Sequence, residues 1–104
     1  MKHDIPHDLD LPTAKKVTDR AFAAYSAEYP DYKPTLSWAN DRKADISFSA
    51  KGIKLSGAMH ISEKNITMEL EVPFLLRVFQ GKAIQVIERE VKVWIAKAKR
   101  GELD

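Results

Sequence analysis

Apolar and polar residues alternate along several neighbouring segments in the middle of the chain. The clearest alternation spans residues 66–72, where apolar residues are separated by Thr67, Glu69 and Glu71. Similar alternation marks residues 36–38, 46–50 and 53–62, with turn sequences at 40–43 and 51–52. Successive side chains of a strand point to opposite faces. The pattern therefore predicts an antiparallel meander with one buried and one solvated face.

Two helical patterns flank these strands. After a short strand over residues 2–9, which Pro6 confines to a sheet edge, apolar residues recur at helical spacing and predict a helix over about 12–28. A second helix is expected over about 82–100, with a core-facing stripe formed by Ile84, Ile87, Val91, Trp94, Ile95 and Ala98.

The order of these elements is β-α-β-β-β-β-α. An α+β fold, in which a curled antiparallel sheet of about four to five strands carries two helices on one face, buries every apolar stripe with short connections. The 104 residues suffice for one hydrophobic core, so residues 1–104 are expected to form a single domain.

Composition narrows the functional classes only slightly. The apolar content of 44% and the charged content of 31% are those of a globular protein. A net charge of +2 is too small to indicate a nucleic-acid partner, and no apolar run is long enough to span a membrane. Without cysteine or an apolar signal-peptide core, the sequence predicts a cytoplasmic protein that lacks a transmembrane segment.

Several short motifs, in this order and spacing, resemble a known family. They are His7-Asp8-Leu9, Trp38-Ala39-Asn40-Asp41, Phe48 with Gly52-Ile53, Leu55-Ser56-Gly57, Phe74-Leu75-Leu76, Gly81-Lys82 and Ile84-Gln85-Val86-Ile87-Glu88. The chain is similar to the putative polyhydroxyalkanoic acid system proteins, small bacterial proteins encoded near polyhydroxyalkanoate synthesis and granule-surface genes. This resemblance implies a connection with storage-polyester granules but no reaction, cofactor or catalytic residue.

Candidate chemistry in the sequence is sparse. The dipeptides His3-Asp4 and His7-Asp8 are the only constellation with metal-ligand character. On an extended segment the histidines and the aspartates point to opposite sides, so two ligands at most converge, too few for a zinc site. Acid-base chemistry requires carboxylates held in apolar surroundings, whereas those such as Glu69 lie on the predicted solvated face. We therefore expect no metal, no cofactor and no enzymatic activity.

An apolar run before and within the second helix predicts an interaction surface. Phe79, Ala83, Val86 and Val93 form a second stripe beside the core-facing one and widen the apolar arc to about 200°, more than one packing surface requires. The first helix, a second copy in a homodimer, or an external apolar surface could cover the remainder. The predicted interaction residues are Phe74, Leu75, Leu76, Phe79, Val86 and Val93.

Two functions from different classes follow. The first is a non-enzymatic accessory protein that associates with the polyhydroxyalkanoate granule surface, or with a granule protein, through residues 74–79. The alternative is a small ligand-binding domain that holds a lipid or hydroxyacyl chain between the sheet and the C-terminal helix. Its predicted pocket is lined by Trp38, Phe48, Met59, Met68 and Trp94.

Overall fold

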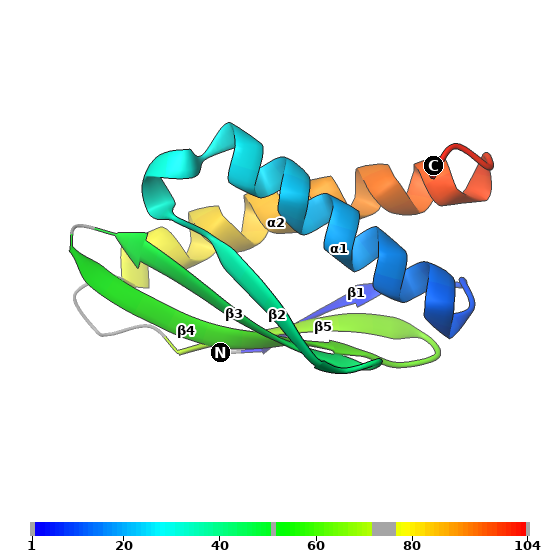
Figure 1. Ribbon diagram of the computed structural model, residues 1–104, viewed down its shortest axis with the longest axis horizontal. Coiled ribbons are helices and arrows are strands. Elements are labelled where there is room, and N and C mark those ends of the chain that lie inside the picture. Colours follow the sequence, from blue (N-terminus) through cyan, green and yellow to red (C-terminus); the bar gives the residue numbers. More distant parts are fainter. Residues whose placement is uncertain (1, 51, 72–76, 104) are drawn as a thin grey trace.

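A computed structural model describes residues 2–50, 52–71 and 77–103, without the side chains of residues 50, 78–80 and 83. The elements follow the predicted order, with one additional 3₁₀ turn, η1, before the second strand (Figure 1). They are β1 (Lys2–Pro6), α1 (Leu11–Glu28), η1 (Pro30–Tyr32), β2 (Thr35–Asn40), β3 (Lys43–Ala50), β4 (Ile53–Ile61), β5 (Asn65–Glu71) and α2 (Arg77–Lys99).

Local chemistry explains where α1 begins, and three element ends can be compared with the prediction. The Asp10 side chain accepts a hydrogen bond of 2.8 Å from the Thr13 N–H and caps α1. The strand β1 ends at Pro6 rather than at residue 9, and the next residue, His7, donates its backbone N–H to Lys64. The helix α2 begins at Arg77, five residues before the predicted start, so the apolar run is partly helical.

All five strands belong to one antiparallel sheet with the order β1-β5-β4-β3-β2. The two helices lie together on one face of this sheet and pack against each other (Figure 1). Gly57 marks a close approach of β4 to β5, because a Cβ atom there would lie 2.1 Å from the Glu69 carbonyl oxygen. The predicted α+β fold is confirmed, with five strands in the sheet and both helices on one side.

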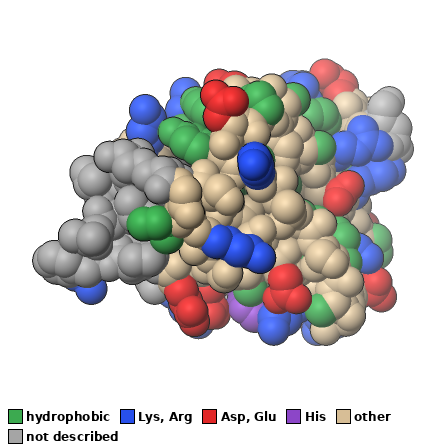
Figure 2. Space-filling view, turned by 60° about the vertical axis from the view of Figure 1, so that its left-hand side comes forward, with side chains coloured by type: hydrophobic (Ala, Val, Ile, Leu, Met, Phe, Trp, Pro, Cys, Tyr) green, Lys and Arg blue, Asp and Glu red, His purple; other side chains and the backbone are tan. Residues whose placement is uncertain are grey.

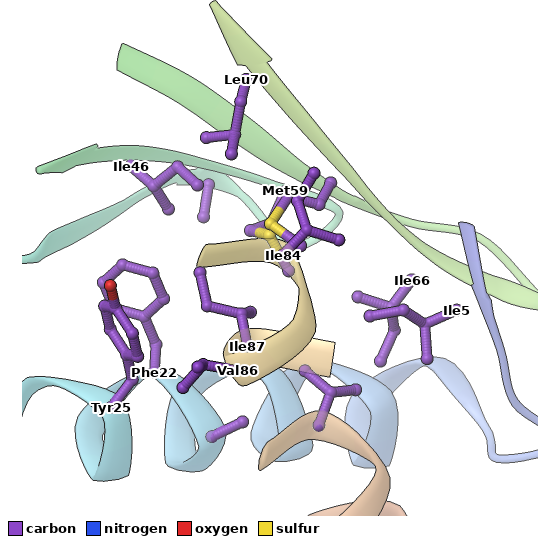
Figure 3. Close-up of a cluster of buried hydrophobic side chains, with 14 of the residues drawn as sticks. Ile5, Phe22, Tyr25, Ile46, Met59, Ile66, Leu70, Ile84, Val86 and Ile87 are labelled. Atoms are coloured by element: carbon purple, nitrogen blue, oxygen red, sulfur yellow. The ribbon is translucent and has the colours of Figure 1, made fainter. Parts of the chain in front are cut away.

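The core fills the space between the sheet and the two helices. Figure 3 shows side chains from the sheet meeting side chains from both helices, among them Ile46, Met59, Leu70, Phe22, Tyr25, Ile84 and Ile87. Trp94 and Ile53 are less buried than the sequence pattern predicts. Trp94 is only partly buried against the core, with the Lys97 ammonium 4.2 Å from the centroid of its ring. Ile53, at the turn end of β4, is 38% exposed.

Candidate functional site

The predicted interaction residues whose side chains the structure describes, Val86 and Val93, do not share one surface. Phe74, Leu75 and Leu76 lie outside the described residues, and Phe79 is described only as backbone of α2. Val86 is 6% exposed and belongs to the core cluster (Figure 3). Its predicted place on a surface stripe was wrong, because α1 packs beside α2 and covers this part of the wide apolar arc.

Small residues on α1 allow this close packing. Ala14 and Ala21 are at most 1% exposed, so the two helix backbones can approach each other. Of the three coverings that the sequence left open for the second stripe, the first helix therefore accounts for Val86. A sequence alone shows the apolar arc of a helix but not which neighbour covers it.

Val93 is 41% exposed and does lie on the surface of α2. It lines a shallow groove on the outer side of the helix with Gln85, Glu88, Arg89, Lys92 and Ala96. Sixteen residues separate it from Arg77, which corresponds to about 24 Å along a helix. Val93 is therefore remote from the end of α2 where the apolar run begins.

The exposed Ile53 lies at that end of the molecule. Ser56, three residues along β4, is paired with Glu71, the last residue of β5, and the chain reaches α2 at Arg77 after residues 72–76. Figure 1 shows the start of β4 and the start of α2 at the same end of the fold. We call this the hairpin end and define it by Ile53, Lys54, Glu71 and Arg77.

Cationic side chains accompany the exposed isoleucine at the hairpin end. Lys54 follows Ile53 on β4, and Arg77 and Lys82 lie in the first turns of α2; all three are exposed. Figure 2, which brings this end forward, shows hydrophobic, basic and acidic side chains beside the grey atoms. Ile53 and Lys54 are successive residues of a strand and point to opposite faces, so the apolar and cationic side chains share one end of the molecule. Such an end suits contact with an apolar boundary that carries anionic groups.

The residues predicted to line a pocket are divided between the core and the surface. Phe48, Met59 and Met68 are at most 4% exposed and fill the core. Trp38 is partly buried at the margin, where its Nε1 donates to Asp19 at 3.3 Å and the Lys15 ammonium lies 5.0 Å from the centroid of its ring. With Trp94 under Lys97, each tryptophan is placed against a surface lysine.

The groove beside Trp38 is an open depression. It is lined by Pro12, Thr13, Lys15, Lys16, Asp19, Trp38, Ala98, Gly101 and Leu103. These residues come from the start of α1, from β2 and from the C-terminal end of the chain. The depression therefore lies outside the core and involves only one of the five predicted pocket residues.

The histidines and aspartates of the N-terminal segment have separate partners. His7 is buried, and its Nε2 lies 2.8 Å from the Ser62 carbonyl oxygen while its Nδ1 accepts the Leu9 N–H at 3.1 Å. His3 Nε2 instead lies 2.9 Å from Glu88 on α2. Asp4 accepts from Thr67 on β5. Among the described residues, no three potential ligands are grouped as a metal site would require.

Hydrogen bonds and ion pairs set the shifted carboxyl pKa values in this region. The hydrogen bond from Lys99 lowers the pKa of Asp8 and outweighs the opposing effect of desolvation. Lys92 lowers the pKa of Glu88, with His3 acting in the same direction. Both carboxylates thus stay ionised near neutral pH, as ion-pair partners rather than proton donors.

An aromatic cluster lies between the helix α1 and the strand β3, and the sequence patterns did not single it out. The ring of Tyr25 packs 5.7 Å from Phe48 and 5.2 Å from Tyr29, measured between centroids. Burial raises the pKa of Tyr25 to about 12, because it disfavours the charged phenolate. Tyr29 and Tyr32 continue the cluster in a stacked pair. Tyr25, Tyr29 and Tyr32 recur at spacings of four and three residues, which is the signal that could have revealed them.

The fold and these contacts define a small α+β protein whose two helices cover one face of a five-stranded antiparallel sheet. A family model described as "Putative polyhydroxyalkanoic acid system protein" matches residues 2–95, so the chain belongs to this family. The resemblance seen in the sequence is thereby confirmed. Neither the curated proteins nor the solved structures contain a match to the chain. None of the described helices is long and apolar enough to cross a membrane.

Proposed function

We propose that this protein is a non-enzymatic accessory protein of polyhydroxyalkanoate granules that attaches by its hairpin end to the granule surface or to a granule protein. The observation that carries the proposal is the family match over residues 2–95, which connects the chain with the polyhydroxyalkanoic acid system. Of the predicted apolar segment 74–79, residues 77–79 begin α2 at this end, and residues 74–76 lie outside the described residues.

Exposure at the hairpin end supports this assignment. Ile53 is one of two large apolar side chains that are clearly exposed among the described residues, and Val93 is the other. Of these two, only Ile53, at the start of β4, belongs to the hairpin end. Insertion of apolar side chains into a polyester boundary would remove them from water, while Lys54, Arg77 and Lys82 keep their charges at the interface.

The core contacts favour attachment over ligand storage. Phe48, Met59 and Met68 pack against side chains of the helices, and Trp38 and Trp94 lie at the margin under lysines. A ligand held between the sheet and the C-terminal helix would require the three core side chains to separate. The surface role requires no change in the core.

Sedimentation with isolated polyhydroxyalkanoate granules tests the proposal. The wild-type protein is expected to pellet with the granules, and Ile53→Asp should reduce the bound fraction, as should the pair Leu75→Asp with Phe79→Asp. Val93→Asp is the matched control, because it places the same charge at an equally exposed valine about 24 Å along α2 from Arg77.

Circular dichroism of each variant separates lost attachment from lost folding. Binding of a folded Ile53→Asp variant at the wild-type level would contradict attachment through the hairpin end. Turnover of hydroxyacyl substrates by the purified wild-type protein would contradict the non-enzymatic role.

A further inference from the structure

The strand β2 forms one edge of the sheet, and its only strand neighbour in the described chain is β3. Its sequence, TLSWAN, contains no charged residue and no proline. Edge strands usually carry charges, prolines or bulges that prevent pairing with another chain. Here the ladder is irregular only between Trp38 and Asn40, so the first four residues of β2 form a regular edge.

The register determines which backbone groups of β3 point toward β2. The Ile61 N–H donates to the Arg42 carbonyl oxygen at 2.8 Å, so this pair is a hydrogen-bonded pair between β4 and the start of β3. Bonded and non-bonded pairs alternate along an antiparallel ladder. The even-numbered residues of β3 therefore form their backbone hydrogen bonds with β4. The odd-numbered residues, Asp45 among them, form theirs with β2.

The same alternation then assigns the backbone groups of β2. Ser37 lies opposite Asp45 and directs its backbone N–H and C=O toward β3. Leu36 and Trp38, on either side of it, direct theirs away from the sheet. Two donors and two acceptors are thus presented along the outer side of β2.

The opposite edge provides a natural contrast. The His7 N–H donates to the Lys64 carbonyl oxygen at 2.8 Å. The odd-numbered residues of β1 therefore direct their backbone N–H and C=O groups toward β5. The outward positions of β1 are therefore Lys2, Asp4 and Pro6. Two of them are charged and the third lacks an N–H, so β1 has the features that block pairing.

We propose that β2 is a self-association edge, on which the β2 strand of a second copy pairs antiparallel about a two-fold axis at Ser37. In this register Leu36 of each copy lies opposite Trp38 of the other, and the outward groups form four backbone hydrogen bonds. The partly buried side chains of Leu36 and Trp38 lie on the helix side of the sheet and would cover each other across the axis.

Charges at the ends of β2 agree with this register. A two-fold axis at Ser37 places Lys33, just before the strand, near Asp41 of the other copy, just after it. Both side chains are exposed, and Asp41 also contacts Lys15 at 3.0 Å. Two opposite-charge pairs, one at each end, therefore support the antiparallel arrangement, whereas a parallel arrangement would bring like charges together.

Analytical ultracentrifugation over a wide concentration range tests the proposal. We expect the wild-type protein to show a weak, reversible monomer–dimer equilibrium, since the shared edge is short. Leu36→Pro removes an outward N–H and should abolish the dimer, yet it spares the bonds between β2 and β3. The matched control is Asp4→Pro, which removes an outward N–H from β1 and should leave the equilibrium unchanged. A wild-type protein that stays monomeric at every concentration would overturn the proposal.

Charge reversal provides a second test that does not depend on proline tolerance. Lys33→Glu and Asp41→Lys should each weaken the dimer severalfold, and the double variant Lys33→Glu with Asp41→Lys should restore it. Circular dichroism confirms that each variant is folded. A dimer that neither Leu36→Pro nor the single reversals weaken would use another surface and would contradict the proposed edge, as would a double variant no stronger than the single ones.

Discussion

The two faces of the sheet are built from alternate residues of the same strands, yet they differ in what lies on them. Toward the helices, Met59, Ile66 and Met68 are at most 1% exposed. On the opposite face, Ser56 and Ser47 point to solvent, and His60 lies 3.4 Å from Glu69 in an exposed ion pair. The comparison teaches that the covered face supplies the packing that stabilises the fold, whereas the open face presents polar and charged side chains to water.

Neighbouring residues of β5 test this difference most strongly. Met68→Ala should lower the free energy of unfolding by about 2–5 kcal/mol, because it leaves a cavity under both helices. Glu69→Ala, one residue further on the open face, should change it by less than about 0.5 kcal/mol. Urea denaturation of both variants measures the two values. Equal effects would contradict the division between the faces.

The substitution Gly57→Ala, which adds a methyl group, tests how tightly the covered face is packed in comparison with the open face. The added Cβ atom would meet the Glu69 carbonyl oxygen at 2.1 Å and Leu70 Cδ2 at 2.9 Å, so β4 and β5 must separate locally. Gly57→Ala should therefore lower the free energy of unfolding by about 1–3 kcal/mol. In the control Ala58→Ser, at the next residue on the open face, chemical denaturation should give a shift below about 0.5 kcal/mol.

The ion pair on the open face should contribute little. A double-mutant cycle with His60→Ala and Glu69→Ala is expected to give a coupling free energy of about 0.2–1 kcal/mol, since both side chains remain in water. Thermal unfolding of the four proteins at low and high salt measures this coupling and its screening. A coupling well above this range would show that the open face is covered in solution.

The ion pair of Glu88, at the rim between the covered face and solvent, should make the stability of the fold depend weakly on pH. Lys92 first, and then His3, lower the pKa of Glu88 in the folded state, so its ionised form stabilises the fold above the ordinary glutamate pKa of about 4.3. This contribution is lost as the pH falls through the lowered value. The melting temperature of the wild type should therefore exceed that of Glu88→Gln at neutral pH, and the difference should shrink in acid. A difference that stays constant down to acid pH would contradict this ion pair.

The spacing of apolar residues and the turn sequences between them were enough to predict most of the fold. Alternation along residues 66–72 indicated a strand with one buried face, and β5 has that pattern. Helical spacing placed Ile84, Ile87 and Val91 in the core. The start of α2 was predicted less accurately, because the same apolar residues suit both a docking segment and the first turns of a helix.

The candidate site depended more on the neighbours of each residue. Val86 and Val93 belong to the same predicted stripe, yet α1 covers the first and leaves the second exposed. Ile53 belongs to the apolar alternation of β4, and its exposure depends on its place at the turn end of the strand.

By itself, the sequence determined the α+β class, the order of the elements and the family resemblance, because these follow from local periodicity and from the order of short motifs. Only the tertiary structure decided that β2 is the second edge beside the predicted edge strand β1, that His7 bonds to the Ser62 carbonyl and that Trp38 lies against Lys15. These contacts join residues that are distant along the chain. Their physical basis is packing and strand register, which no local pattern of apolar and polar residues contains.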